Sequence, residues 1–260
     1  MNSSRLLVMI TIVVMIFSLI ELYFFIALPL HVVANNSFKD GVNHWNSKLV
    51  KGDDIVDLWL NRTSEKVASE SYSCALTLLE RNNTSLVSNS VWAVLYQQLA
   101  EHPLTKSSTL RFSMMLGGSN FERALLYSDA AAVYVSFMVT NETNEFFLTY
   151  AWVLRETDSV KITSETFQEA TSLETLYLER INGSSMENLT VVYETPIFQS
   201  SGRENNILTH GDWKIRGSIE AGILLWNFGS PSFPWTFTLY IGYIDITYYW
   251  PLDSIFAGGY

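Results

Sequence analysis

Segments with the character of β-strands recur through most of this chain and constrain its fold more than any other feature. They are rich in β-branched and aromatic residues, and many alternate apolar with polar positions. Turn-like clusters such as ERNNTS, TNETNE and INGSS separate them. About nine strands without βαβ alternation predict an antiparallel sandwich or barrel. The segments are SYSCALTL, VWAVLYQQL, LRFSMML, AAVYVSFMV, EFFLTYAWVL, LTVVYET, DWKIRGSIE, AGILLWNF and WTFTLYIGYIDITYY.

Helical signals are scarce in the same part of the chain. Only QEATSLETLYLER, Gln168 to Arg180, could form a helix of any length there, and it can also be read as a loop with a strand. The expected fold is therefore all-β.

A long apolar run precedes the strand-like segments. It covers the 25 residues from Leu6 to Leu30. A helix of that length spans roughly 37 Å, enough to cross a hydrocarbon core of about 30 Å. Arg5 is the only nearby cation, so the positive-inside rule places residues 1–5 in the cytoplasm and everything after residue 30 outside the cell. We therefore predict a single-pass transmembrane helix over residues 6–30 in the cell membrane.

Two features of this run leave alternatives open. Val32-Val33-Ala34 would serve as a cleavage site if the run were a signal peptide instead of an anchor. Glu21 interrupts the run, and an ionisable residue inside a membrane needs a proton or a partner. We consider Glu21 a candidate contact to another membrane helix, the alternative being a protonated or headgroup-facing side chain.

Charge and cysteine content exclude several classes of function. The chain has a formal net charge of −10, and the outer part carries the same charge because the N-terminal segment holds one Arg and one Glu. An acidic surface without a basic stripe argues against nucleic acid as a partner. Cys74 is the only cysteine, so no intrachain disulfide can form. Its strand-like surroundings predict a buried, unreactive thiol.

Glycosylation sequons are more frequent than chance would place them. They begin at eight of the 17 asparagines. Asn2 falls on the predicted cytoplasmic side, and Asn35 lies close to the predicted bilayer. The excess favours an outward-facing glycoprotein with glycans in turn-like segments. The candidate sites are Asn61, Asn82, Asn83, Asn141, Asn182 and Asn188.

The stretch after the apolar run resembles the first strand of galactose-binding-like jelly rolls, which include several families of carbohydrate-binding module. The resemblance rests on the pattern Asn-x-Ser-Phe-x-x-Gly-x-x-x-Trp from Asn35 to Trp45, and on FTLYIGYIDITYY, which holds Asp245 as the family's last strand holds an Asp. SYSCALTL, WAVLYQQL and GDWKIRGSIE resemble strands between them. The resemblance implies an antiparallel jelly-roll β-sandwich over residues 35–250, followed by a tail over residues 251–260. The topology predicted from the apolar run makes this sandwich extracellular.

The same resemblance bears on cofactors. The family often has a Glu directly after the Phe of the first strand, which contributes with the late Asp to a structural calcium site. This chain has Lys39 there, which removes an oxygen ligand and adds a repelling charge. The calcium site is therefore in doubt, and we predict no cofactor. Asp53, Asp54 and Asp57 are expected to form a solvated acidic loop, an ion site being the alternative.

The residue patterns contain no catalytic or metal-ligand motif. The four His are not spaced as metal ligands, and there is no nucleophile elbow or phosphate loop. Aromatic rings are the more informative class, because sugars stack their apolar faces on exposed Trp and Tyr. Trp92 with Tyr96, and Tyr150 with Trp152, each project from one face of a strand. They are our candidate ligand-binding residues, with packing in the core as the alternative.

These observations favour a non-catalytic, membrane-anchored cell-surface protein. It would recognise a glycan or another surface protein, or have a structural role in the envelope. One alternative is an accessory subunit of a larger membrane complex, with Glu21 and the sandwich as docking surfaces. Another is a glycan-processing enzyme, which would need two carboxylates flanking a glycosidic bond.

Overall fold

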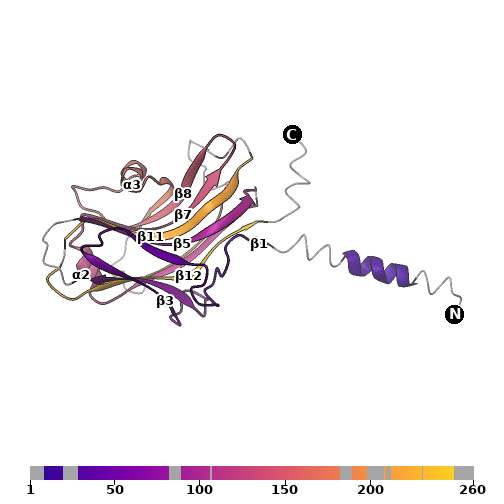
Figure 1. Ribbon diagram of the computed structural model, residues 1–260, viewed down its shortest axis with the longest axis horizontal. Coiled ribbons are helices and arrows are strands. Elements are labelled where there is room, and N and C mark those ends of the chain that lie inside the picture. The colour runs from indigo at the N-terminus through magenta and orange to yellow at the C-terminus, as the bar shows by residue number, and fades with distance from the viewer. Residues whose placement is uncertain are drawn as a thin grey trace.

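The computed structural model describes residues 9–19, 29–81, 89–105, 107–181, 189–197, 208, 212–229 and 231–248. Two β-sheets pack face to face in these residues, with two short helices beside them (Figure 1). The two helices beside the sheets are α2 (Phe121–Leu125) and α3 (Ser164–Thr171). The strands are β1 (Leu30–His31), β2 (Asn46–Lys51), β3 (Val56–Thr63), β4 (Ser73–Glu80), β5 (Asn89–Pro103), β6 (Thr109–Gly117), β7 (Ala130–Thr140), β8 (Glu145–Arg155), β9 (Glu174–Arg180), β10 (Thr190–Pro196), β11 (Lys214–Phe228) and β12 (Thr236–Tyr248).

The strand order is that of a jelly roll. The first sheet runs β10-β6-β12-β4-β3, with β1 also paired to β12, and the second runs β2-β5-β11-β7-β8-β9. Among these described strands every pair is antiparallel except β8 with β9. The chain crosses between the sheets from β1 to β2, β2 to β3, β4 to β5, β5 to β6, β6 to β7, β9 to β10, β10 to β11 and β11 to β12. The central strands β10-β6-β12-β4 and β5-β11-β7-β8 thus form two interlocked Greek keys, and the predicted antiparallel jelly-roll sandwich is confirmed.

The main hydrophobic core fills the space between the two sheets. Alternate residues of each strand point into it, as the twofold repeat of a strand requires. On β7 these are Val133, Val135 and Phe137, all fully buried. Cys74 on β4 has no exposed surface either, and burial raises the pKa of its thiol far above the usual range. The prediction that Cys74 is buried is therefore confirmed.

The segment that resembles a first strand is not a strand. Residues 32–44 form a series of turns between β1 and β2, with positive φ at Asn35, Phe38 and Gly41. Phe38 is nevertheless fully buried, and its ring lies 5.4 Å from that of Trp45, which is 4% exposed. The two aromatic residues therefore anchor this segment in the core, and turns instead of strand pairing hold them there.

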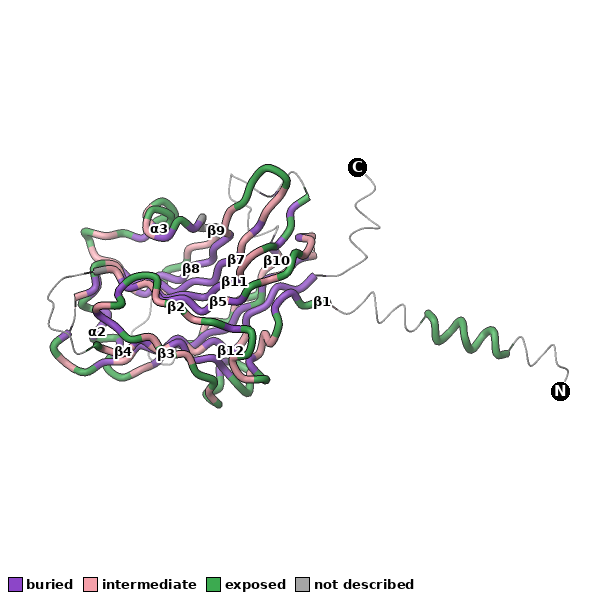
Figure 2. Tube along the Cα trace, viewed as in Figure 1, coloured by how far each residue is buried: buried purple, intermediate pink, exposed green. Residues whose placement is uncertain are grey.

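The N-terminal run differs at its end from the predicted span. Leu30 lies in β1, paired with Tyr248 of β12, so it cannot be the last residue of a helix. Residues 9–19 form a helix that is exposed along its length (Figure 2). Within the described part of the chain, no helix has both the length and the apolar character needed to cross a bilayer. Glu21 and the tail over residues 251–260 lie outside the described residues.

The stretch from Gln168 to Arg180 contains both of the structures considered for it. α3 ends at Thr171, and β9 begins at Glu174 and pairs in parallel with β8. A capping box between Thr163 and Thr166 starts α3. DWKIRGSIE and AGILLWNF, expected as two strands, form the single strand β11 because Glu220 and Ala221 continue the same ladder.

Candidate ligand-binding face

The outer face of the second sheet is divided between a covered and an open region. α3 and its flanking loops cover one end, where Ile162, Phe167 and Leu173 form a small second core with apolar residues of β7, β8 and β11. Figure 1 shows α3 lying over this sheet, beside β8. The region towards the edge strand β2 is not part of this second core, apart from Trp92. It is the candidate ligand-binding face.

A row of polar side chains crosses this face. Strand register places Asn46 of β2, Tyr96 of β5, Glu220 of β11, Ser136 of β7 and Thr149 of β8 opposite one another in turn. The Ser136 and Thr149 hydroxyls lie 2.8 Å apart and satisfy each other. Five neighbouring strands therefore contribute one polar residue each, and of these Ser136 and Thr149 have no exposed surface.

A chain of hydrogen bonds leads from an indole to a buried carboxylate on the same face. Trp92 Nε1 donates to Tyr134 Oη at 2.7 Å, and the Tyr134 hydroxyl donates to Glu220 Oε1 at 3.1 Å. Gly222 makes this possible, because a Cβ there would lie 2.6 Å from Tyr134 Oη. The rings of Trp92 and Tyr134 are thus fixed in orientation by Glu220.

Burial makes this carboxylate unusual. Glu220 is only 7% exposed, and desolvation raises its pKa, opposed by the hydrogen bond from Tyr134 and by the charge of Lys48. Desolvation and the nearby Glu220 charge also raise the pKa of Tyr134. The Tyr134–Glu220 pair thus keeps a hydrogen-bond acceptor, the Glu220 carboxylate, among the aromatic residues of this face.

Two of the four candidate ligand-binding residues lie on this face. Trp92 and Tyr96 are both partly exposed on it, and Lys48 Nζ lies 5.3 Å from the centroid of the Tyr96 ring. Tyr150 and Trp152 point the other way and are fully buried between the sheets, where the Trp152 ring stacks on Phe112 at 5.4 Å. Because these two rings have no exposed surface, they cannot stack on a ligand. The prediction of ligand binding is wrong for them, and the alternative of packing in the core is correct.

Sequence reasoning missed Tyr134 and Glu220. A usable signal existed for Glu220, which interrupts the apolar stretch around GSIEAGILL on a strand covered on both sides. An acidic residue in such a position needs a partner, and this requirement marks functional sites. Tyr134 gave no such signal, because a Tyr among Ala and Val reads as core.

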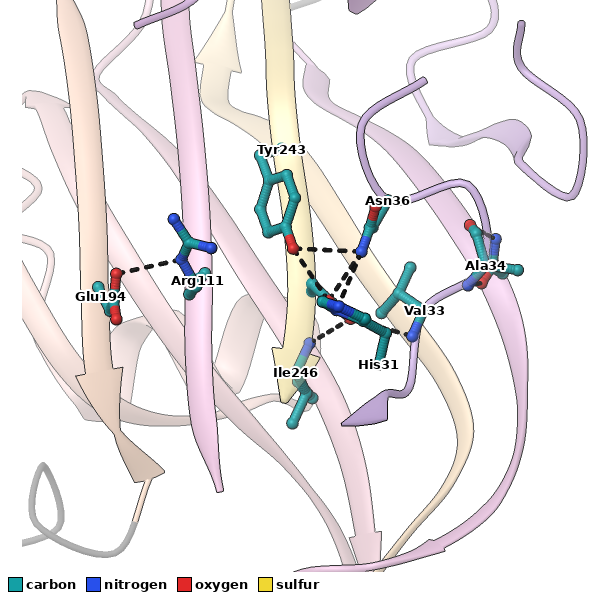
Figure 3. Close-up of polar contacts among 10 residues, drawn as sticks. His31, Val33, Ala34, Asn36, Arg111, Glu194, Tyr243 and Ile246 are labelled. Atoms are coloured by element: carbon teal, nitrogen blue, oxygen red, sulfur yellow. Dashed lines mark hydrogen bonds and ion pairs between the residues drawn. The ribbon is translucent and has the colours of Figure 1, made fainter. Parts of the chain in front are cut away.

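A second polar constellation joins the two ends of the domain (Figure 3). Asp245 has no exposed surface, and its carboxylate accepts from the backbone N–H groups of Val33 and Ile246 at 3.1 and 2.8 Å. It also accepts from Asn36 Nδ2 at 2.8 Å and from the ring of His31, with which it forms an ion pair when His31 is protonated.

These contacts concern the calcium site of the family, because Asp245 corresponds to the late Asp that contributes to that site. Tyr243 Oη adds a further donor to Asp245, at 3.1 Å. The two Asp245 oxygens are thus engaged by N–H and O–H donors of the chain itself. Lys39 is exposed, on the turn before Gly41. The described residues also contain no group of three or more His, Cys, Asp or Glu side chains placed to hold a metal ion.

Two of the candidate glycosylation sites fall within the described residues. Asn61 is exposed on β3, and Asn141 lies in the β7–β8 turn, where its Oδ1 accepts from the backbone N–H of Asn144 at 2.8 Å. Asn82, Asn83, Asn182 and Asn188 lie outside the described residues.

Comparison with known proteins gives distant structural similarities. No protein-family model matches the chain, and no curated protein sequence matches it. The enzymatically active domain of tailspike protein 4 of bacteriophage CBA120 is similar with a TM-score of 0.38 and 10% identity. That similarity covers 83% of this chain, which spans only 21% of the tailspike chain.

Two carbohydrate-binding modules are similar over most of their length. A family 11 module from Clostridium thermocellum, solved with a mixed-linked tetrasaccharide, has a TM-score of 0.40 and 10% identity over 84% of this chain and 95% of its own. CBM27-1 from Caldicellulosiruptor saccharolyticus, solved with mannohexaose, has a TM-score of 0.39 and 11% identity over 84% and 96%. At such low similarity, function has to be inferred from this chain's own residues.

Proposed function

We propose that this protein is a non-catalytic glycan-binding module. The observation that carries the proposal is the outer face of the second sheet, where Trp92 and Tyr96 lie partly exposed beside Lys48 and the buried acceptor Glu220. A sugar ring has apolar C–H faces that stack on aromatic rings and hydroxyls that bond carboxylate and ammonium groups. This face offers both kinds of partner side by side.

Binding is favoured over hydrolysis by the composition of the polar row. Glycosidases use two carboxylates about 5–10 Å apart across the scissile bond. The row contains Glu220, and its other members are Asn46, Tyr96, Ser136 and Thr149. Glu220 is moreover already engaged by Tyr134.

We further propose that the module is presented outside the cell on its apolar N-terminal segment. The length and composition of residues 6–30 and the single cation Arg5 support this location. Leu30 then joins the sandwich directly through β1, so the module would stand close to the membrane surface.

An oligosaccharide array probed with the purified protein tests the proposed function. Tyr96→Ala should weaken binding at least about fivefold, the effect of losing a central aromatic contact. Tyr127→Ala is the matched control, because Tyr127 is 41% exposed in the loop between α2 and β7, where its ring contacts Phe233. Equal binding by wild type and Tyr96→Ala would refute the assignment of this face.

A further inference from the structure

The outer face of the first sheet carries a separate small cavity. It lies where the β3–β4 loop folds over β6, β10 and β12, and it has a volume of about 50 Å³. Its polar lining comes from Ser69 and Glu70 of the loop, Arg111 and Ser113 of β6, Glu194 of β10 and Tyr243 of β12. We call it the outer pocket.

A glycine sets the shape of the outer pocket. Gly242 is an extra residue in β12, where the pairing with β6 shifts between Ile241 and Tyr243. A Cβ on Gly242 would lie 2.7 Å from Val67 Cβ and 3.0 Å from Ser113 Oγ. The bulge therefore lets the loop approach the sheet and turns Tyr243 towards the cavity wall.

The charged groups of the outer pocket are held in place but retain bonding capacity. Arg111 Nε donates to Glu194 Oε2 at 3.1 Å, which leaves the two Nη groups as donors (Figure 3). The Arg111 guanidinium also lies 5.0 Å from the centroid of the Tyr243 ring. Ser113 is 4% exposed, and its Oγ has no hydrogen-bond partner within the described part of the chain.

The balance of these groups decides the class of ligand. Two carboxylates, Glu70 and Glu194, repel an anion, and the Arg111 guanidinium repels a cation. A neutral molecule with several hydroxyls can donate to the carboxylates and accept from Arg111 at the same time. The volume of the pocket corresponds to a few water molecules, so only one edge of a sugar ring fits.

We propose that the outer pocket binds the hydroxyl-bearing edge of a single neutral sugar residue. It lies on the opposite sheet from Tyr96 and forms a second, independent site. The choice of sugar as the ligand class rests on the proposed glycan-binding function. A chain with sites on both faces could bridge two glycans, and bridging raises the overall affinity without any new contact.

Equilibrium dialysis of the full-length protein in detergent tests this inference. The probes are radiolabelled methyl glycosides of glucose, galactose, mannose and N-acetylglucosamine. Ser69→Phe should block the mouth of the pocket and remove one bound molecule per chain. Ser64→Phe, at an exposed position earlier in the same loop, should leave binding unchanged. Glu70→Gln should weaken this site about tenfold, as expected for the loss of one charged hydrogen bond.

The outcomes separate the two sites. Wild-type binding that survives Ser69→Phe and Glu70→Gln but is lost in Tyr96→Ala would overturn the outer pocket and keep the proposed function. Binding lost in Ser69→Phe and kept in Tyr96→Ala would support the pocket while the face of the second sheet fails. No bound glycoside in the wild type overturns the pocket, and the oligosaccharide array then decides the proposed function alone.

Discussion

At the scale of single residues, two buried carboxylates have opposite surroundings. Asp245 accepts hydrogen bonds from two backbone amides and three side chains. Glu220 accepts a hydrogen bond from the Tyr134 hydroxyl. Donors stabilise a carboxylate in its charged form, and desolvation without them destabilises it. The contacts of Asp245 therefore stabilise its charged form and the fold, whereas burial disfavours the charged form of Glu220.

Asp245→Ala should destabilise the protein by at least about 2 kcal/mol, because the buried amide of Val33 and the amide of Ile246 lose their acceptor at about 1–3 kcal/mol each. Denaturant melts measure the loss. Asp40→Ala, in an exposed turn, is the control and should change stability by less than about 0.5 kcal/mol. Equal losses in the two variants would contradict the role given to Asp245.

Glu220→Gln should stabilise the protein at neutral pH. Burial raises the pKa of Glu220 in the folded state, so the wild type is relatively stable below the unfolded pKa of about 4.3 and loses stability as pH rises through the folded value. Gln keeps an acceptor for Tyr134 and has no charge to desolvate. Denaturant melts at pH 7 should therefore show Glu220→Gln as the more stable protein, and melts near pH 4 should show no difference from wild type.

At the scale of elements, the short strand β1 matters more than its length indicates. It pairs with β12 and is followed by Val32 and Val33, which are 7% and 3% exposed. Gln97 of β5 continues the connection, since its amide donates to and accepts from the backbone of Ala34 at 2.9 Å in both directions. These contacts fasten the segment after the apolar run to both sheets.

A chain that begins at residue 36 should therefore be less stable than one that begins at residue 29. Burial of the two valines alone contributes about 1.5–3 kcal/mol each, so the difference should exceed about 3 kcal/mol. Circular dichroism melts of the two fragments in denaturant measure it. Identical midpoints would mean that β1 and its contacts contribute nothing to the sandwich.

At the scale of the whole molecule, both described ends of the sandwich lie together. Leu30 pairs with Tyr248, so the chain enters and leaves at one end, while α2 lies at the other (Figure 1). A membrane anchor before residue 30 would then point α2 away from the bilayer and leave the outer faces of both sheets open to the side. That orientation suits a module with a site on each face.

Protease added to intact cells should remove the sandwich and leave a small membrane fragment, if residues 6–30 anchor it with the N-terminus inside. The expectation follows from the length of the apolar run and from Arg5. Immunoblots for each end of the chain detect both products. Release of the intact chain by a salt wash would contradict the anchor.

The sequence by itself determined most of the segments that become strands, and their pattern indicated an antiparallel sandwich or barrel. The resemblance to jelly rolls favoured the sandwich. Alternation and β-branched or aromatic content are local properties, and they placed β4 to β8 and β10 to β12 within a few residues. The sequence also indicated that Cys74 is buried, because the thiol lies in a segment with the apolar pattern of a strand.

Only the tertiary structure decided which face each aromatic residue occupies. Trp92 with Tyr96, four residues apart, and Tyr150 with Trp152, two residues apart, both have the even spacing that places two side chains on one face of a strand. The first pair nevertheless lies on an outer face and the second in the core. A shift of one residue in strand register exchanges the two faces, and α3 makes part of the outer face apolar as well. The tertiary structure also decided the long-range polar contacts. His31 and Asp245, for example, are more than 200 positions apart in the sequence, and no local pattern encodes their contact.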